Sequence, residues 1–424
     1  MNRLLLAFLL LAFGAGFFKA SRHHVAAGFQ LSPPIVAGNA EARFRSSFAS
    51  SKQHIQTHAA SAVELKDGRI RAFWFSGSRE GAKDVEIHSA VFDPVQESWS
   101  PEQAVATREG TEHSLLRYIS KLGNPVAGRT ADGTLWLYYV TVSMGGWAGS
   151  SITAMSSPDD GATWSPARRL ITSPFLNIST LVKGTPFHYS DGSMGLPVYH
   201  EFISKFGEIL HFDRSGALID EQRLTAAGDG ALQPVVLVQS DKDALALMRH
   251  AGDKHRNVVS VSTGDGGLHW TAPVKSVLSN PDSALSAVAL ADGRLLAVLN
   301  NLEHGRDALS LMISADGGRN WKNLYQLEDM RKQQADEMQF MQAIRGLVRD
   351  TDARAAAAPD GYVDSAKSQA CHEHRCLSEF SYPYLIQASN GDFHLVYTWN
   401  RSFIKHVWFN QAWVEQRLKA SGHD

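Results

Sequence analysis

The chain has 424 residues, of which 44% are hydrophobic and 20% are charged, an ordinary composition for a soluble globular protein. A formal net charge of −2 removes any electrostatic case for a nucleic-acid partner. The length allows one large closed architecture or two to three smaller domains, and the 20 Phe and 10 Trp residues favour β-structure.

Residues 1–24 form a distinct N-terminal segment, in which Arg3 precedes an apolar run from Leu4 to Phe18. The run has the length of the apolar part of a signal peptide and is short for a membrane span. Because no clean small-residue cleavage site follows, a cleaved signal peptide and an uncleaved membrane anchor both remain open. In either case we expect an exported protein that is periplasmic, membrane-anchored or secreted.

A turn followed by an apolar, strand-like run recurs six times along residues 45–424. The copies are KDGRIRAFWF at Lys66, ADGTLWLYYV at Ala131, SDGSMGLPVY at Ser190, KDALALMR at Lys242, ADGRLLAVLN at Ala291 and SNGDFHLVYT at Ser389. Asp-Gly or Asn-Gly between apolar runs indicates a hairpin turn, because both residues tolerate positive φ. A repeat of roughly 50 residues is typical of a four-stranded propeller blade. The pattern therefore predicts an all-β, six-bladed β-propeller.

A second repeat has the form Ser/Thr-x-Asp-x-Gly-x-x-Trp. Its copies are SPDDGATW (157–164), TGDGGLHW (263–270) and SADGGRNW (314–321). The Asp can cap its own turn, the Gly takes a conformation closed to other residues, and the Trp fills the hairpin. We expect these hairpins on the face away from the functional site, each with a largely buried Trp.

This second repeat is the Asp-box, and residues 55–410 resemble the sialidase (neuraminidase) superfamily of six-bladed propellers. The segments WFSGSREGAKDVEI, NPDSALSAVALADGRLL and EFSYPYLIQASNGDFHLVYTWNRSFIKH are similar to the branch of predicted neuraminidases. The Asp-box also occurs in propellers without sialidase activity, so the resemblance bears on fold more than on function.

An insertion at about 327–377 separates the last two blades. The run DMRKQQADEMQFMQAIRGLVRD has a helical apolar stripe, so the insertion is expected to be partly helical. Cys371 and Cys376 end it in the run CHEHRC. In an exported protein they predict a disulfide. The alternative is a metal site that adds His372 and His374, and the spacing is weak for structural zinc.

The resemblance implies roles for five residues. Arg249 and Arg306 match two arginines that hold the substrate carboxylate, a task that suits the fixed fork of a guanidinium. Tyr382 matches the nucleophile, which sialidases use in place of a carboxylate. Asp84 falls in the acid/base loop, and Arg79 resembles an accessory arginine there. Each has an ordinary structural alternative, such as a turn cap for Asp84 or a core ring for Tyr382.

Two positions depart from the family pattern. His58 stands where the first substrate-binding arginine is expected, and Gln233 stands where the Glu partner of the Tyr is expected. A Gln cannot accept the phenol proton, so another group has to replace it. Glu201 is the main candidate, with Glu208 and Glu379 as further ones.

The leading hypothesis is therefore a monomeric glycoside hydrolase that acts on an acidic sugar, either sialic acid or a uronate-type glycan. A second hypothesis is a polysaccharide lyase, in which His58, Tyr382 and two arginines abstract the proton beside a uronate carboxylate. A third is a propeller that binds glycan without catalysis. The chain carries no motif for a metal, nucleotide or flavin cofactor.

Overall fold

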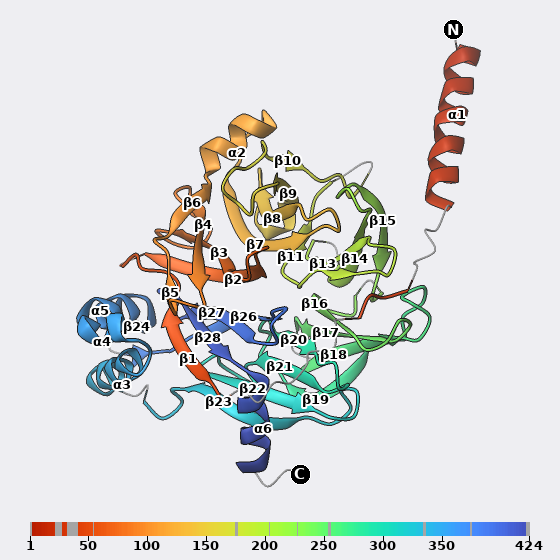
Figure 1. Cartoon of the computed structure of the whole chain (residues 1–424). Helices are drawn as coiled ribbons and strands as arrows, with labels where there is room; N and C mark the ends of the chain where they lie inside the picture. Colours follow the sequence, from red (N-terminus) through yellow and green to blue (C-terminus); the bar gives the residue numbers. More distant parts are fainter. Residues whose placement is uncertain are drawn as a thin grey trace.

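The computed structural model has six β-sheets arranged as blades around a central channel (Figure 1). This confirms the predicted all-β, six-bladed propeller. The structure describes residues 2–21, 28–31, 41–53, 55–173, 177–202, 204–226, 228–252, 256–333, 336–373 and 375–420.

The first three blades follow one another along the chain, each running outward from a strand beside the channel. Blade 1 contains β2 (Gln56–Glu64), β3 (Ile70–Gly77), β4 (Glu86–Asp93), β5 (Ser98–Trp99) and β6 (Gln103–Ala106). Blade 2 contains β7 (Lys121–Arg129), β8 (Leu135–Val142), β9 (Ser150–Ser157) and β10 (Arg168–Arg169). Blade 3 contains β11 (Thr180–Val182), β12 (Phe187–His188), β13 (Met194–His200), β14 (Phe206–Phe212) and β15 (Leu218–Arg223).

The last three blades complete the ring, and the N-terminal strand closes it. Blade 4 contains β16 (Ala231–Val238), β17 (Ala244–His250), β18 (Asn257–Thr263) and β19 (Val274–Ser279). Blade 5 contains β20 (Ser286–Ala289), β21 (Leu295–Leu299), β22 (Ala308–Ser314) and β23 (Lys322–Asp329). Blade 6 contains β26 (Phe380–Gln387), β27 (Phe393–Trp399), β28 (Phe403–Phe409) and β1 (Phe44–Phe48), which pairs antiparallel with β28. Because the outer strand of blade 6 comes from the start of the chain, the ring is held shut by backbone hydrogen bonds.

The Asp-boxes form three similar turns after the third strands of blades 2, 4 and 5. In the first, Asp159 Oδ1 accepts hydrogen bonds from Ser157 Oγ (2.8 Å) and Thr163 N (2.8 Å), and Gly161 takes φ +90°. The third strands begin at the end of the channel where His58 and Tyr382 lie and run to the opposite end, so the Asp-boxes that follow them lie away from these two residues as predicted. Their tryptophans Trp164, Trp270 and Trp321 are half-buried, so the expectation of largely buried rings is wrong; each ring packs against a hydrophobic cluster formed by two neighbouring blades.

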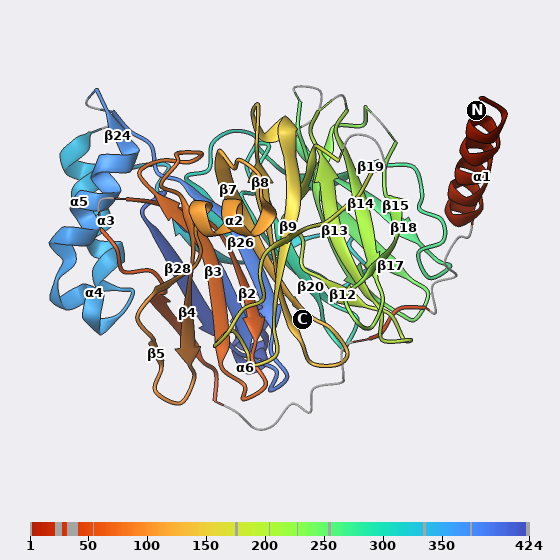
Figure 2. The same ribbon diagram turned by 90° about the horizontal axis from the view of Figure 1, so that it is seen from above.

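The segment between β23 and β26 holds helices on the outer side of blade 6 (Figure 2). They are α3 (Glu337–Arg349), α4 (Ala353–Ala357) and α5 (Pro359–Ala370), followed by the hairpin β24 (Cys371–His372) and β25 (Arg375–Cys376). Phe340, Ile344 and Val348 form the buried stripe of α3. Cys371 and Cys376 form a disulfide, and His374, named in the metal alternative, lies outside the described residues.

Four further helical segments lie outside the blades. They are α1 (Asn2–Ser21), α2 (Arg108–Leu115), the 3-10 turn η1 (Trp147–Gly149) and α6 (Gln411–Ala420). Helix α1 projects from the propeller (Figure 1), and residues 1 and 22–24 of the N-terminal segment lie outside the described residues. Over the described ranges, no helix combines the length and the apolar character needed to cross a membrane.

Candidate functional site

Four of the six strands beside the channel are interrupted by a bulge near the same end. The pairing register shifts in β2, β7, β16 and β26, and at each shift one residue other than Gly takes positive φ. These residues are Ala59 (φ 54°), Asn124 (41°), Gln233 (54°) and Tyr382 (52°). The last three each precede a proline, which disfavours helical backbone at its neighbour, so the left-handed conformation is strained there. A bulge changes the direction in which a side chain points. The four bulges lie at one end of the channel, which is where the candidate site is found.

Tyr382 lies at the centre of the cluster. Its hydroxyl accepts hydrogen bonds from Arg249 Nη1 (3.3 Å) and from Gln233 Nε2 (3.4 Å). Its ring centroid is 4.3 Å from that of His58, and the Arg306 Cζ atom lies 6.0 Å from the ring. The structure thus brings together five residues that the sequence placed on four different blades.

Gln233 connects Tyr382 to a second, buried tyrosine. Its Nε2 also donates to Tyr199 Oη at 3.2 Å, which accepts a further bond from Asn124 Nδ2 at 3.2 Å. Burial raises the pKa of Tyr199 well above its ordinary value, with Tyr382 and Glu201 adding to the shift. The Gln233 amide can hydrogen-bond a hydroxyl through either its oxygen or its nitrogen, but neither atom takes up a proton.

Asp282 lies against both predicted substrate-binding arginines. Its Oδ1 is 3.1 Å from Arg249 Nε, and its backbone carbonyl accepts from Arg306 Nη2 at 3.0 Å. Asp282 takes φ +60° in the turn before β20, and Asn280 holds this turn through Ser283. The Arg249 side chain is only 11% exposed. A carboxylate of the protein therefore occupies one edge of the guanidinium that the sequence assigned to substrate.

An ion network that sequence reasoning missed continues from Arg306. Glu379 Oε1 is 3.2 Å from Arg306 Nη1, and Glu379 Oε2 is 2.7 Å from Arg401 Nε. Arg401 also pairs with Glu80 at 2.8 Å. Burial alone would raise the pKa of Glu379, but His58, Arg401 and Arg306 outweigh it and hold the pKa at about 2. Arg401 thus brings a third guanidinium to the cluster, from the blade beside the missing first arginine.

The signal for Arg401 was local but easy to pass over. Asn400 (φ 50°) and Arg401 (φ 52°) are the two left-handed residues of the turn between β27 and β28. Such a turn is usual in a hairpin, and Asn-Arg is a poor match to the Asn-Gly pattern. No spacing rule within one blade predicts that its arginine meets Glu80 from blade 1.

His58 is fully enclosed beside Tyr382. Its Nδ1 is 2.9 Å from Thr398 Oγ1, which also accepts a hydrogen bond from Ala59 N at 3.1 Å. Burial, with the nearby Arg401 charge, lowers the pKa of His58 to about 3. The imidazole is therefore neutral at physiological pH, and His58 does not supply the positive charge of the arginine expected at its position.

The remaining predicted residues lie around this cluster rather than within it. Glu201 follows β13, and burial raises its pKa, against the opposing charges of Arg249 and Lys205. Asp84 is exposed and caps a turn, because it accepts hydrogen bonds from Ser78 N and Ser78 Oγ, both at 2.9 Å. Arg79 is exposed on the same loop, whereas Glu80 is the loop carboxylate that bonds Arg401.

Glu208, the other proposed replacement, is engaged elsewhere. It bonds His200 at 2.6 Å and Arg223 at 3.3 Å on the outer side of blade 3. Among the residues that the structure describes, no group of three or more His, Cys, Asp or Glu side chains is placed to hold a metal ion.

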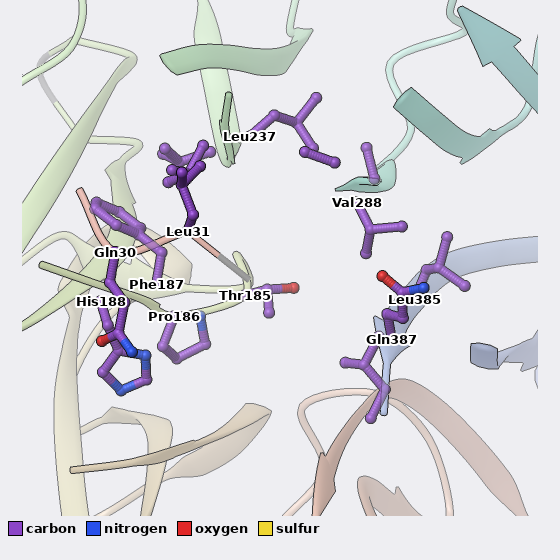
Figure 3. A pocket seen from close by; sticks show the side chains of 15 residues that line it. Gln30, Leu31, Thr185, Pro186, Phe187, His188, Leu237, Val288, Leu385 and Gln387 are labelled. Carbon is purple, nitrogen blue, oxygen red and sulfur yellow. The ribbon is translucent and has the colours of Figure 1, made fainter. Parts of the chain in front are cut away.

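A cavity of about 330 Å³ opens at the other mouth of the channel (Figure 3). Its walls come from the far ends of the channel strands and include Leu237, Val288 and Leu385, with Thr185 and His188 as polar groups. This cavity lies at the Asp-box end. It is therefore separate from the Tyr382 cluster.

Comparison with known proteins places the fold in a family. A BNR repeat-like domain matches residues 68–395. Among solved structures, a Hadza microbial sialidase is 15% identical with a TM-score of 0.62, covering 84% of this chain and 66% of its own. The intramolecular trans-sialidase of Ruminococcus gnavus is 11% identical with a TM-score of 0.60, covering 87% of this chain and 96% of its own.

A protein of unknown function from Dyadobacter fermentans is as similar, at 13% identity and a TM-score of 0.62, covering 86% of this chain and 98% of its own. No curated protein sequence matches this one. At these identities the similar structures show a shared fold. They do not assign an activity to this chain. The matched domain spans most of the chain, so this protein belongs to the family of BNR repeat-like propellers, and it shares its fold with the sialidase structures.

Proposed function

We propose that the protein is a glycoside hydrolase that acts on a sugar carrying a carboxylate, with Tyr382 as its nucleophile. The observation that carries the proposal is the position of Tyr382, whose hydroxyl accepts from Arg249 and whose ring lies against His58 and near Arg306. N–H donors aimed at this oxygen would stabilise negative charge that develops on it during attack. A phenol also suits an anionic sugar, because a carboxylate nucleophile would repel it.

Glu201 is the proposed acceptor of the Tyr382 proton. It is the carboxylate that shares the electrostatic environment of Arg249 and Tyr199 with Tyr382, and burial raises its pKa. A carboxyl group with a raised pKa exchanges protons more readily near neutral pH than an ordinary Glu. Glu379 is less suited, since its pKa of about 2 and its two arginine partners keep it ionised. Asp84 stays a predicted acid for the leaving group.

The charge balance of the cluster sets a condition on the substrate. Arg249, Arg306 and Arg401 are each paired with a carboxylate of the protein. A substrate carboxylate gains most at Arg249, where Asp282 occupies only the Nε edge and is itself 38% exposed. We propose that the sugar carboxylate binds between Arg249 and Arg306 and competes there with Asp282.

The first experiment tests Tyr382 with a panel of sialosides and uronate oligosaccharides. Tyr382→Phe should abolish turnover while sugar affinity stays within about threefold, because the ring remains and the hydroxyl is not a charged contact. Tyr118→Phe is the matched control, since Tyr118 is an exposed tyrosine in the connection between α2 and β7. Turnover that survives in Tyr382→Phe would contradict the assignment of the nucleophile.

The second experiment tests the carboxylate contacts. Arg249→Lys and Arg306→Lys should each weaken binding of the acidic sugar by about tenfold or more, because a point charge cannot reproduce a bidentate contact. Arg294→Lys is the control, because Arg294 pairs with Asp292 and Glu415 at the other end of the propeller. Unchanged affinity in both site variants would exclude the proposed contacts.

A polysaccharide lyase is the second candidate, and the contact between the His58 and Tyr382 rings favours it. The buried imidazole, with a pKa of about 3, is too weak a base to abstract the sugar proton itself, so Tyr382 would be the base and His58 a neutral hydrogen-bonding neighbour. A lyase would release an unsaturated uronate that absorbs ultraviolet light, whereas hydrolysis releases only a new reducing end. If the wild-type protein binds an acidic sugar and releases neither product, both enzymatic proposals fail and glycan binding alone remains.

We further propose an exported location, in which such glycans occur. The support is the apolar segment at Leu4–Phe18 and the disulfide between Cys371 and Cys376. Alkaline phosphatase fused after residue 44 should be active in a bacterial host, and an inactive fusion would contradict export.

A further inference from the structure

Lys183 is a buried amine that no step above uses. It follows β11, the channel strand of blade 3, and its side chain is almost fully enclosed at 3% exposure. Its Nζ donates to the backbone carbonyl of Pro383 at 3.1 Å. The same atom lies 4.9 Å from the Tyr384 ring centroid and 5.9 Å from that of Tyr382.

The hydrogen bond between Lys183 and Pro383 crosses the channel. Neighbouring blades contact one another in chain order around the ring, so blades 3 and 6 face each other across it. Lys183 comes from blade 3, and Pro383 belongs to β26 of blade 6. Thr185 and Leu385, which lie two residues beyond Lys183 and Pro383, line the cavity at the far mouth (Figure 3). Lys183 therefore forms a floor between that cavity and the Tyr382 cluster.

The carbonyl that Lys183 holds belongs to the residue directly after Tyr382. Tyr382 has φ +52° within a bulge and precedes a proline, so its backbone has a strong tendency to leave this conformation. Such strain persists only where surrounding contacts enforce it. A cross-channel donor at Pro383 opposes rotation of the Tyr382–Pro383 segment and so fixes where the hydroxyl lies.

The absence of an acidic partner makes a purely structural role difficult to explain. Among the described residues, the contacts of Lys183 are a carbonyl and two aromatic rings, and none is a carboxylate. A buried ammonium without a carboxylate destabilises a fold, and an apolar residue of the same length would pack there at least as well. Groups that reduce stability in this way are found where activity needs them.

We infer that Lys183 is a positioning residue, which spans the channel and holds Tyr382 in its left-handed bulge through the Pro383 carbonyl. The effect on turnover rests on the proposed function, whereas the effect on the Tyr382 conformation does not. The two can therefore be tested separately.

The test compares Lys183→Met with Lys183→Arg and with Lys405→Met. Methionine preserves length and apolar contact but removes the donor, whereas arginine restores a cationic donor. Lys405 is the matched control, because it is a buried lysine that pairs with Glu328 at 2.7 Å in β28, away from the Tyr382 cluster. Ring-labelled tyrosine, with the Tyr382 signal assigned from Tyr382→Phe, reports the position of the ring in each protein without any substrate.

In Lys183→Met we expect the Tyr382 signal to shift or split while the melting temperature does not fall. Lys183→Arg should return the signal toward the wild-type position. Lys405→Met should lower the melting temperature and leave the Tyr382 signal unchanged. Once a substrate is known, Lys183→Met should lower kcat by about tenfold or more with KM within about threefold.

An unchanged Tyr382 signal in Lys183→Met would overturn the inference, as would a fall in melting temperature as large as that of Lys405→Met. If wild type turns over no substrate, the proposed function fails, and the signal comparison still decides the role of Lys183.

Discussion

Replacing Lys183 by Met should make the protein more stable, and the gain should depend on pH. Burial lowers the pKa of Lys183 from 10.5 to about 7 in the folded protein, whereas an unfolded lysine keeps an ordinary value. Between these two values the unfolded chain binds more protons than the folded one, so wild-type stability rises as pH rises from about 7 to about 10.5. Methionine does not titrate, so the variant lacks this dependence.

The magnitude follows from the two pKa values. At about 1.4 kcal/mol for each factor of ten, the difference between 10.5 and about 7 amounts to about 5 kcal/mol at pH 6. At pH 9.5 between about a quarter and a third of this penalty remains. The stability difference between Lys183→Met and wild type should therefore shrink by about 3 kcal/mol between pH 6 and pH 9.5. These are upper bounds, since relaxation around a buried charge reduces its penalty.

The assay is equilibrium unfolding by urea of both proteins at the two pH values, with the disulfide intact. All other titrating groups are shared, so subtraction isolates position 183. Equal slopes against urea in both proteins would show that the unfolded states are alike. A stability difference that is the same at pH 6 and pH 9.5, or a variant less stable than wild type at pH 6, would refute the reasoning.

Three further outcomes follow from other contacts. Asp282→Asn should tighten binding of an acidic sugar by about tenfold, measured by calorimetry, because it removes the carboxylate beside Arg249; weaker binding would mean that Asp282 contacts the sugar itself. Glu379→Gln should have a lower free energy of unfolding than wild type at pH 7. This difference should disappear as pH falls from about 4.5 to about 2, because the pKa of Glu379 is depressed in the folded protein and wild type loses the contribution of the carboxylate when it is protonated. Trp321→Ala should lower the free energy of unfolding by about 2–3 kcal/mol, less than for a fully buried ring. An effect in urea unfolding no larger than that of replacing an exposed surface residue by Ala would contradict the packing role of Trp321.

The blades were predictable from sequence because their signals are local. An Asp-Gly turn such as Asp67-Gly68 needs positive φ, and Gly68 takes φ +82° in the structure. Arg249, Arg306 and Tyr382 were also within reach through the family resemblance, because each matches a family residue by its distance from a turn or Asp-box of its own blade. Strand length fixes which end of the channel such residues reach.

Glu80, Arg401, Asp282 and Lys183 were beyond the same reasoning. Each gains its role from a partner on another blade, such as Glu80 in blade 1 with Arg401 in blade 6, or Lys183 in blade 3 with Pro383 in blade 6. Pairings of this kind depend on the height of each residue along the channel, and a bulge shifts that height by a residue. Asp84 and Glu80 lie in one loop, and only their hydrogen bonds with Ser78 and Arg401 show that Asp84 caps an exposed turn while Glu80 joins the cluster.

The four bulges explain why the site lies at one end of the channel. In a regular strand the side chains alternate between the two faces of a blade, so neighbouring blades fill the space between them with apolar groups. The extra residue of each bulge leaves this alternation, and Asn124, Gln233 and Tyr382 become the polar groups of the cluster. Left-handed backbone at such residues costs about 1–3 kcal/mol each, and this strain does nothing to stabilise the blades. Ala59 carries the same backbone without a polar side chain, and there the neighbouring His58 fills the space against Tyr382. The strain is thus concentrated around one hydroxyl, as expected if the purpose of the bulges is to hold Tyr382 rather than to stabilise the blades.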